Sequence, residues 1–279
     1  MDLLIVRHAA PATGYDEERR EATFGGDPPL SVLGRRQAAA VAERLAGAAL
    51  THLYSSPSVR CMETAQAICA AAGHCGRAVP WLEEWGWVWR GWGPAREQTA
   101  RCFPQVAPAQ PPSEAGWGMA RGEGDARPEV SRPALRARGE AVVALLEGAH
   151  GRAEGDRVAL VTSMGFSGAA LLPALLGTTR EQASFDLDHA AVTEVQCGPA
   201  RNFIVRANGA RHLAGLTAVL CADAGCAHAS PHLEDRACRR CGGPVMAKCP
   251  WCRSFIAAPV ARTCPQCGRG YHGEQAPRT

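Results

Sequence analysis

Short apolar runs alternate with longer amphipathic stretches along most of this chain. Residues 3–6 form an apolar run typical of a buried strand, and residues 33–45 repeat apolar positions every three or four residues, as an amphipathic helix does. The same pattern predicts further strands at 52–55, 78–80, 158–162, 192–195 and 203–205, and further helices at 60–72, 133–147 and 167–176. Such alternation predicts a three-layer α/β/α fold around a mostly parallel, mixed sheet.

Two stretches need a separate interpretation. Residues 93–132 combine proline, glycine, alanine and charged residues without periodicity, which predicts an inserted lid or loop. Residues 158–177 carry no charge over a length close to that of a membrane span. Because Gly165, Gly168 and Pro173 interrupt this run, we predict a buried strand followed by a helix of small residues instead.

The thirteen cysteines divide the chain into two parts, because eight of them follow residue 220. We therefore predict a first domain at 1–216 and a second domain at 217–279. The five earlier cysteines lack metal-binding spacing, which favours buried thiols of a reduced, cytoplasmic protein over a disulfide framework. They are Cys61, Cys69, Cys75, Cys102 and Cys197. The first apolar run, which ends at Arg7, also lacks the length and the basic start of an export signal.

The tail holds two cysteine quartets with closely similar spacing. In each quartet, one pair of cysteines is followed after eleven intervening residues by a second pair. The quartets are Cys221, Cys226, Cys238 and Cys241, then Cys249, Cys252, Cys264 and Cys267. Four thiolates close a tetrahedral zinc site and leave no position for substrate, so we predict two structural zinc ions in a zinc-ribbon-like domain. Two alternatives stay open: the central CxxC steps sharing one metal, and His228 or His232 replacing a cysteine.

The charge of the chain limits its partners. A formal net charge of +3 is too small to indicate a nucleic-acid or membrane partner, since such binding needs a concentrated basic face. In the tail, eight thiolates and two zinc ions nearly cancel the modest basic excess. We therefore predict that the tail either stabilises the first domain or docks a protein partner.

Candidate chemistry begins at the end of the first strand. Arg7 and His8 follow it directly, at the edge where open α/β sheets hold their ligands. Further along, the chain reads GGDPPLSVLGRRQA and then LYSSPSVRCMETAQAI. Together with LLIVRHA at the start, these segments resemble the histidine phosphatase superfamily, which includes phosphoglycerate mutases, in order and spacing. The later segment TEVQCGPARNFIVRANGARHL is similar to the closing strands of that family, so the resemblance covers residues 1 to about 215.

The resemblance implies a phosphohistidine mechanism. His8 would be the nucleophile that attacks phosphorus, and water would then hydrolyse the phosphohistidine. Arg7 and Arg60 would bind the phosphoryl oxygens, a role that suits the planar, permanently charged guanidinium group. The family supplies the leaving-group proton from a carboxylic acid in a Leu-x-Glu context, which selects Glu84 here, although alignment to a downstream glycine selects Glu83.

Tryptophans surround this candidate acid, at positions 81, 85, 87, 89 and 92. An apolar wall of indoles would raise the pKa of a carboxyl group towards a value useful for a general acid. The same indoles are suited to stack on an aromatic or nucleotide-like leaving group, or to pack the lid.

The chain departs from the family after the strand at 158–162. Where the family has a second histidine, this sequence has Ser163 or, in the other register, Met164. Ser163 retains one hydroxyl that can donate to phosphate. Among other histidines, His189 could reach the site from the start of a later strand, whereas His212 is assigned a structural role.

Two functions follow from these residues. The first is a phosphomonoesterase of the histidine acid phosphatase type, acting on a phosphorylated small molecule, with hydrolysis preferred over mutase chemistry because it demands less of the site. The second is a degenerate, phosphate-binding adaptor that docks a partner through its zinc ribbon. Retention of His8, Arg7, Arg60 and an acid favours the first function, whereas the missing second histidine favours the other.

Overall fold

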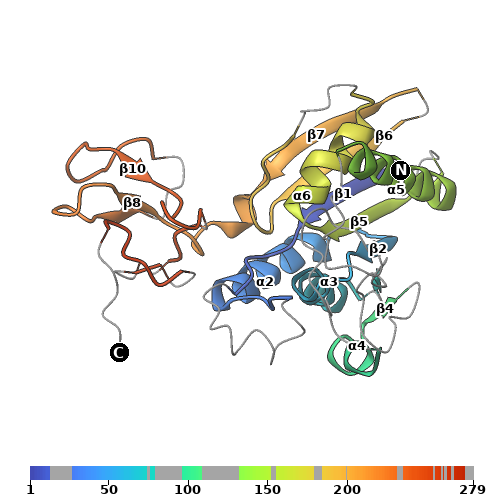
Figure 1. Ribbon diagram of the computed structural model, residues 1–279, viewed down its shortest axis with the longest axis horizontal. Helices are drawn as coiled ribbons and strands as arrows, with labels where there is room; N and C mark the ends of the chain where they lie inside the picture. Colours follow the sequence, from blue (N-terminus) through green and yellow to red (C-terminus); the bar gives the residue numbers. More distant parts are fainter. Residues whose placement is uncertain are drawn as a thin grey trace, which may run out of the picture.

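The computed structural model comprises a larger α/β unit and a smaller cysteine-rich unit that lie side by side (Figure 1). The smaller unit flanks one end of the larger one, and the chain passes once from one to the other. The residues that the structure describes are 1–12, 27–73, 76–78, 96–108, 132–151, 155–178, 184–198, 200–230, 235–253, 255–258, 260, 263–264 and 267–273.

Among these residues, the larger unit contains a seven-stranded mixed sheet in the order β4-β3-β2-β5-β1-β6-β7. Strands β4, β3, β2, β5 and β1 run parallel to one another, and β6 and β7 continue the sheet in antiparallel fashion. The strands are β1 (Asp2–Arg7), β2 (His52–Ser55), β3 (Gly76–Ala78), β4 (Val106–Pro108), β5 (Arg157–Thr162), β6 (Val192–Cys197) and β7 (Asn202–Gly209). The predicted, mostly parallel mixed sheet is therefore confirmed.

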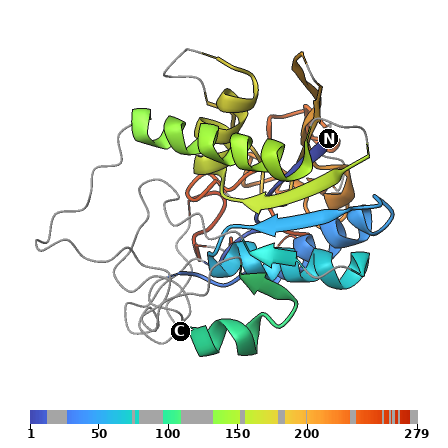
Figure 2. The same ribbon diagram turned by 90° about the vertical axis from the view of Figure 1, so that its right-hand side faces the viewer.

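Helices cover both faces of this sheet, as a three-layer fold requires. Helices α2 (Val32–Ala46) and α3 (Val59–Ala72) pack on one face, and α5 (Arg132–His150) packs on the other with the helical segment 164–175. Figure 2 shows this arrangement, with α5 in green on one side of the sheet and α2 and α3 in blue and cyan on the opposite side. Two separate apolar cores therefore lie between the sheet and its helices, one on each face.

The start of α2 lies close to the loop after β1. Ser31 caps the helix by accepting a hydrogen bond from the Gly34 amide, as a serine N-cap does. A Cβ atom at Gly34 would lie 2.0 Å from the carbonyl oxygen of Ala10, so only glycine permits this approach. The contact fixes the loop that follows the first strand against the helix layer.

Two expectations for the middle of the chain need correction. Within the predicted lid or loop at 93–132, the structure places helix α4 (Arg96–Cys102) and the edge strand β4, so 96–108 belong to the sheet unit. This short helix has no apolar stripe, and tertiary contacts hold it, because Thr99 and Phe103 are buried. Residues 109–131 lie outside the described part of the chain.

The predicted helix at 167–176 begins earlier and is irregular. It comprises α6 (Met164–Phe166), the π-helical segment η2 (Ser167–Leu171) and α7 (Leu172–Leu175). A Cβ at Gly168 would lie 2.1 Å from the carbonyl oxygen of Phe185, which explains a small residue here. No helix in the described part of the chain has both the length and the apolar character needed to cross a bilayer.

The smaller unit is built around three short strands, β8 (Val219–Cys221), β9 (Ala229–Ser230) and β10 (Val245–Met246). Its apolar core, which includes Leu220, Ile256 and Tyr271, is small. Just before it, the turn η3 (Arg211–Leu213) still packs on the larger unit, whereas Ala218 pairs with Ile256 of the smaller one. We therefore propose a domain boundary between residues 216 and 217, as the cysteine distribution predicts.

Candidate functional site

The central strand β1 delivers His8 to the carboxyl edge of the sheet. Its backbone amide donates to the Thr162 carbonyl of the adjacent β5 at 2.9 Å, which extends the strand register by one residue. The His8 side chain is only 5% exposed. A buried imidazole at this edge, where α/β sheets bind ligands, is well placed to react with a bound group.

Hydrogen bonding determines which nitrogen of His8 is available. Nδ1 lies 2.8 Å from the Ala9 carbonyl oxygen, which can only accept, so we assign the proton to Nδ1. The pKa of His8 is lowered well below its ordinary value, first by burial and then by the nearby charges of Arg60 and Arg7. The ring is therefore neutral at neutral pH and keeps Nε2 unprotonated, as a nucleophile must be.

Arg60 faces this nitrogen from the first turn of α3. Its Nε lies 3.2 Å from His8 Nε2, and its Nη1 forms a 2.8 Å ion pair with Asp27. Asp27 is fully buried, and its second oxygen accepts from the Val59 amide at 2.6 Å, so it fixes both the helix start and the guanidinium. The sequence analysis missed Asp27, although the segment GGDPPLS contained the signal.

Arg7 is the second guanidinium group close enough to His8 to affect its charge state. Its Nη1 donates to the Leu187 carbonyl, and its Nη2 lies 2.8 Å from Nε2 of His189. Burial lowers the pKa of Arg7 to about 10, against the opposing effect of Asp188, so the side chain remains cationic at neutral pH. Both predicted guanidinium groups therefore lie near one neutral imidazole.

His189 is the residue whose place in the site the sequence could not decide. Its ring centroid lies 5.4 Å from that of His8. The pKa of His189 is lowered well below its ordinary value by burial and then by Arg7, Arg60 and Lys248. A weak signal for this placement existed, since His189 closely precedes a strand predicted to join the sheet.

The backbone beside His189 is tied to β1. Ala190 adopts a positive φ of 57°, which is rare for a residue with a side chain, and its amide donates to the Arg7 carbonyl at 3.1 Å. Its carbonyl accepts from His212 Nε2 at 2.8 Å, while His212 Nδ1 lies 3.1 Å from Arg44. His212 thus holds the segment in place and does not contact His8 or Arg7 in the described hydrogen bonds.

Ser163 follows β5 at the same edge of the sheet, one residue beyond the position paired with Arg7. Its hydroxyl oxygen accepts from the Phe166 amide at 3.3 Å, and its carbonyl accepts from Ser167. The serine therefore caps a short helical turn. Met164 is 37% exposed and forms no part of a charged cluster among the described residues.

Residues 79–95 lie outside the described part of the chain. Glu84, the alternative acid Glu83 and the tryptophans at 81–92 fall in this range. Their assignment as a general acid and its apolar surroundings rests on the sequence.

The two cysteine quartets converge as predicted. Within each quartet, all four sulfur atoms lie within 4.8 Å of one another. The Sγ atoms of Cys221 and Cys241 are 3.6 Å apart, and those of Cys249 and Cys267 are 3.8 Å apart. A tetrahedral ion with metal–sulfur bonds of about 2.3 Å requires sulfur–sulfur distances of about 3.8 Å, so each quartet fits one zinc-sized ion. The alternative pairings of cysteines are not needed.

The four cysteine turns share a backbone feature. The residue after the second cysteine of each pair has a positive φ: Ala227, Gly242, Arg253 and Gly268. In the turns at Gly242, Arg253 and Gly268, the amide of this residue donates to the carbonyl of the first cysteine, at distances from 2.8 to 3.0 Å. The repeated turn explains why two of the positions are glycine.

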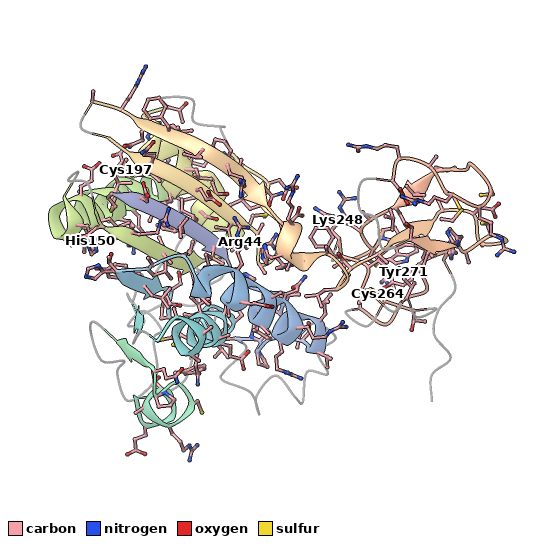
Figure 3. All side chains as sticks on the ribbon, turned by 180° about the vertical axis from the view of Figure 1, so that it is seen from behind. Arg44, His150, Cys197, Lys248, Cys264 and Tyr271 are labelled. Carbon is pink, nitrogen blue, oxygen red and sulfur yellow. The ribbon has the colours of Figure 1, made fainter. Side chains whose placement is uncertain are left out.

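The cysteine-rich unit contacts the segment that carries His189. Lys248 forms a 2.5 Å ion pair with Asp188, whose other oxygen accepts from Asn208 at 2.9 Å. Figure 3 shows Lys248 between the two units, at the end of the sheet opposite to His150 and Cys197. The smaller, cysteine-rich unit, which is the metal-binding unit, therefore lies at the edge of the sheet where β1 and β5 have their carboxyl ends.

A third cluster of metal-ligating residues lies at that opposite end, formed by His52, His150 and Asp156. Both ring nitrogens of His150 already have partners, the Tyr54 hydroxyl at 2.7 Å and Asp156 at 3.1 Å. A metal ion would have to break one of these bonds. The cluster is therefore best explained as a buried hydrogen-bonded chain.

Comparison with known proteins gives one family match and several solved structures of similar fold. Residues 3–209 match the histidine phosphatase superfamily (branch 1). A mycobacterial glucosyl-3-phosphoglycerate phosphatase in complex with VO3 is 23% identical, with a TM-score of 0.50 over 75% of this chain and 99% of that chain. A putative alpha-ribazole-5'-P phosphatase from Escherichia coli is 16% identical, with a TM-score of 0.50 over 75% and 97%. These likenesses show the fold. No curated protein matches this chain.

Proposed function

We propose that this chain, which belongs to the histidine phosphatase superfamily, hydrolyses phosphate monoesters of small molecules through a phosphohistidine on His8. The observation that carries the proposal is the neutral His8 ring, whose Nε2 lies 3.2 Å from Nε of Arg60 and whose charge state is also affected by the nearby Arg7. Because the match is to branch 1 of the superfamily, we do not assign the histidine acid phosphatase type.

The described residues account for the first half of the reaction. Nε2 of His8 attacks the phosphorus of the monoester, and the bond from phosphorus to the ester oxygen breaks as the nitrogen–phosphorus bond forms. Arg7 and Arg60 supply two positive charges to the phosphoryl oxygens in a largely buried site, where such charges act strongly. Asp27 holds Arg60 in place, and we propose that the Ser163 hydroxyl donates a further hydrogen bond to the phosphoryl group.

Proton transfer completes the cycle. We propose that Glu84 protonates the departing alkoxide and that its carboxylate then takes a proton from the water that attacks phosphorus. This attack breaks the nitrogen–phosphorus bond, releases inorganic phosphate and regenerates neutral His8.

For the cysteine quartets we propose zinc, because four thiolates at tetrahedral spacing select a thiophilic ion and leave no open coordination position. The bound ions would stabilise the fold of the smaller unit. Contacts from Lys248 to Asp188 and from Arg36 to the Ala258 carbonyl favour a fixed support for the larger unit over a free docking module for a protein partner.

The experiment is hydrolysis of an aryl phosphate by the zinc-loaded protein and by its His8→Ala variant. A matched control is His52→Ala, which removes an exposed histidine at the opposite end of the sheet. We expect turnover in the wild type and the control but not in His8→Ala, together with an acid-labile, base-stable phosphoryl adduct in the wild type.

The competing function is a phosphate-binding adaptor that lacks turnover. It would be favoured if neither wild type nor His8→Ala hydrolysed any of a panel of phosphate monoesters, while inorganic phosphate still raised the melting temperature of the wild type and not of Arg60→Ala. Equal turnover in wild type and His8→Ala would exclude His8 as the nucleophile.

A further inference from the structure

The order of the strands determines which side chains lie on either side of His8. Strand β1 lies between β5 and β6, and His8 projects from its carboxyl end. The β5 side presents Ser163, a neutral hydroxyl that caps a turn. On the β6 side, the segment that leads into the strand presents His189, whose ring centroid lies 5.4 Å from that of His8.

We propose that His189 is a second catalytic histidine, which binds the phosphoryl group during its transfer to and from His8 and takes on positive charge in the transition state. The proposal rests on the phosphohistidine function proposed above. It places the second imidazole on the β6 side of β1, where the sequence pattern of the family does not place it.

The hydrogen bonds of the ring suit this role. Nε2 of His189 lies 2.8 Å from Nη2 of Arg7, which can only donate, so Nε2 accepts and the neutral ring carries its proton on Nδ1. No described residue forms a hydrogen bond with Nδ1. The ring therefore retains one donor that a ligand bound beside Arg7 and His8 could use.

The charges around the ring explain why a substrate would change its state. Burial and the neighbouring cations Arg7 and Arg60 lower the pKa of His189 in the absence of ligand. A phosphoryl dianion bound to the two guanidinium groups offsets their charge and adds an attractive partner, so it raises the pKa of His189. When Arg7 Nη2 turns from His189 to the phosphoryl oxygens, Nε2 of His189 can take up a proton from solvent, and the imidazolium then stabilises the charge that develops on the transferring group.

The structure also holds the ring in place before substrate binds. Ala190, in its positive-φ conformation, is bonded through its amide to Arg7 and through its carbonyl to His212. On the other side of His189, Asp188 is held by Asn208 and by Lys248 of the metal-binding unit. Such support on both sides is what a preorganised catalytic group requires.

The test compares wild type, His189→Ala, His189→Gln and the control His52→Ala as zinc-loaded proteins. The amide oxygen of Gln preserves an acceptor for Arg7 but cannot become a cation, so His189→Gln separates folding from catalysis. We expect kcat to fall about 100-fold in both His189 variants with little change in KM. Inhibition by orthovanadate, which mimics the transition state, should weaken in parallel with kcat.

Several outcomes would overturn the proposal. One such outcome is that the wild type hydrolyses the substrate, His8→Ala is inactive, and His189→Gln keeps the wild-type kcat and vanadate affinity. The phosphohistidine function would then stand, and the role of His189 would be refuted. A rise in KM alone would show that His189 only binds substrate. Absence of turnover in every protein, wild type included, would refute both the proposed function and this inference.

Discussion

The buried pair of Asp27 and Arg60 allows a quantitative prediction for the variant Asp27→Asn. The Arg60 side chain is 11% exposed and that of Asp27 is fully buried, so water can compensate little for a lost charge. Removing one partner of a buried ion pair costs about 3–5 kcal/mol. Asparagine can still accept from the Val59 amide, so we expect the lower end of this range, a loss of about 3 kcal/mol in the free energy of unfolding.

The same substitution should impair catalysis. Without Asp27, the Arg60 guanidinium loses the contact that aims it at His8 Nε2, and each 1.4 kcal/mol lost from transition-state binding lowers kcat/KM about tenfold. We expect kcat/KM to fall by about tenfold to a hundredfold. Because bound phosphate offers Arg60 a new anionic partner, added phosphate should recover part of the lost stability.

The assays are denaturant unfolding with and without phosphate, and steady-state hydrolysis of an aryl phosphate. Asp2→Asn is the matched control, since its ion pair with Arg157 spans 3.4 Å and both side chains are more than 40% exposed. A partly exposed pair of this kind contributes about 0–1 kcal/mol. If Asp27→Asn behaved like Asp2→Asn in both assays, the reasoning on this buried pair would be wrong.

Three further predictions concern the rest of the molecule. Arg253→Gly should raise the stability of the metal-binding unit by about 0.5–1 kcal/mol, because glycine adopts the positive φ of 60° without strain, and thermal unfolding would measure it. The pKa of His212 is lowered from 6.5 to about 4, chiefly by burial, so its neutral form is stabilising above pH 6.5 and this contribution is lost as the pH falls from 6.5 towards 4. His212→Gln should therefore reduce the stability difference between pH 7 and pH 5 by about 1 kcal/mol after solvent screening, and equal differences in both proteins would contradict this. Metal analysis should find two zinc ions per chain, and chelation should expose residues 219–273 to protease while 1–12 and 27–73 stay protected, an outcome that uniform digestion would rule out.

The sequence predicts most of the fold because its elements are encoded locally. The apolar run before Arg7 and the periodic stretch at 33–45 become β1 and α2 with shifts of one residue at their ends. The pattern fails at 96–108, where a short polar helix and an edge strand depend on contacts made by Thr99 and Phe103. Local patterns cannot reveal an element whose stability comes from distant neighbours.

The same distinction applies to the site. The motif around Arg7 and His8, the position of Arg60 and the spacing of eight cysteines are written along the chain, and each places its residues through a nearby strand, helix or turn. For Asp27 and His189 the local signals, the GGDPPLS segment and the start of a predicted strand, do not reveal which residues they contact. Asp27 reaches Arg60 across 33 positions, and His189 reaches Arg7 across 182.

By itself, then, the sequence determined the alternating architecture and the spacing of the cysteine quartets, and it singled out His8, Arg7 and Arg60 as candidate site residues. Only the tertiary structure decided what surrounds them. The sheet order places β6 beside β1 and so brings His189 next to His8, and the folded tail brings Lys248 to Asp188. The physical reason is that strand neighbours and contacts between units depend on packing the whole chain, whereas motifs depend on residues a few positions apart.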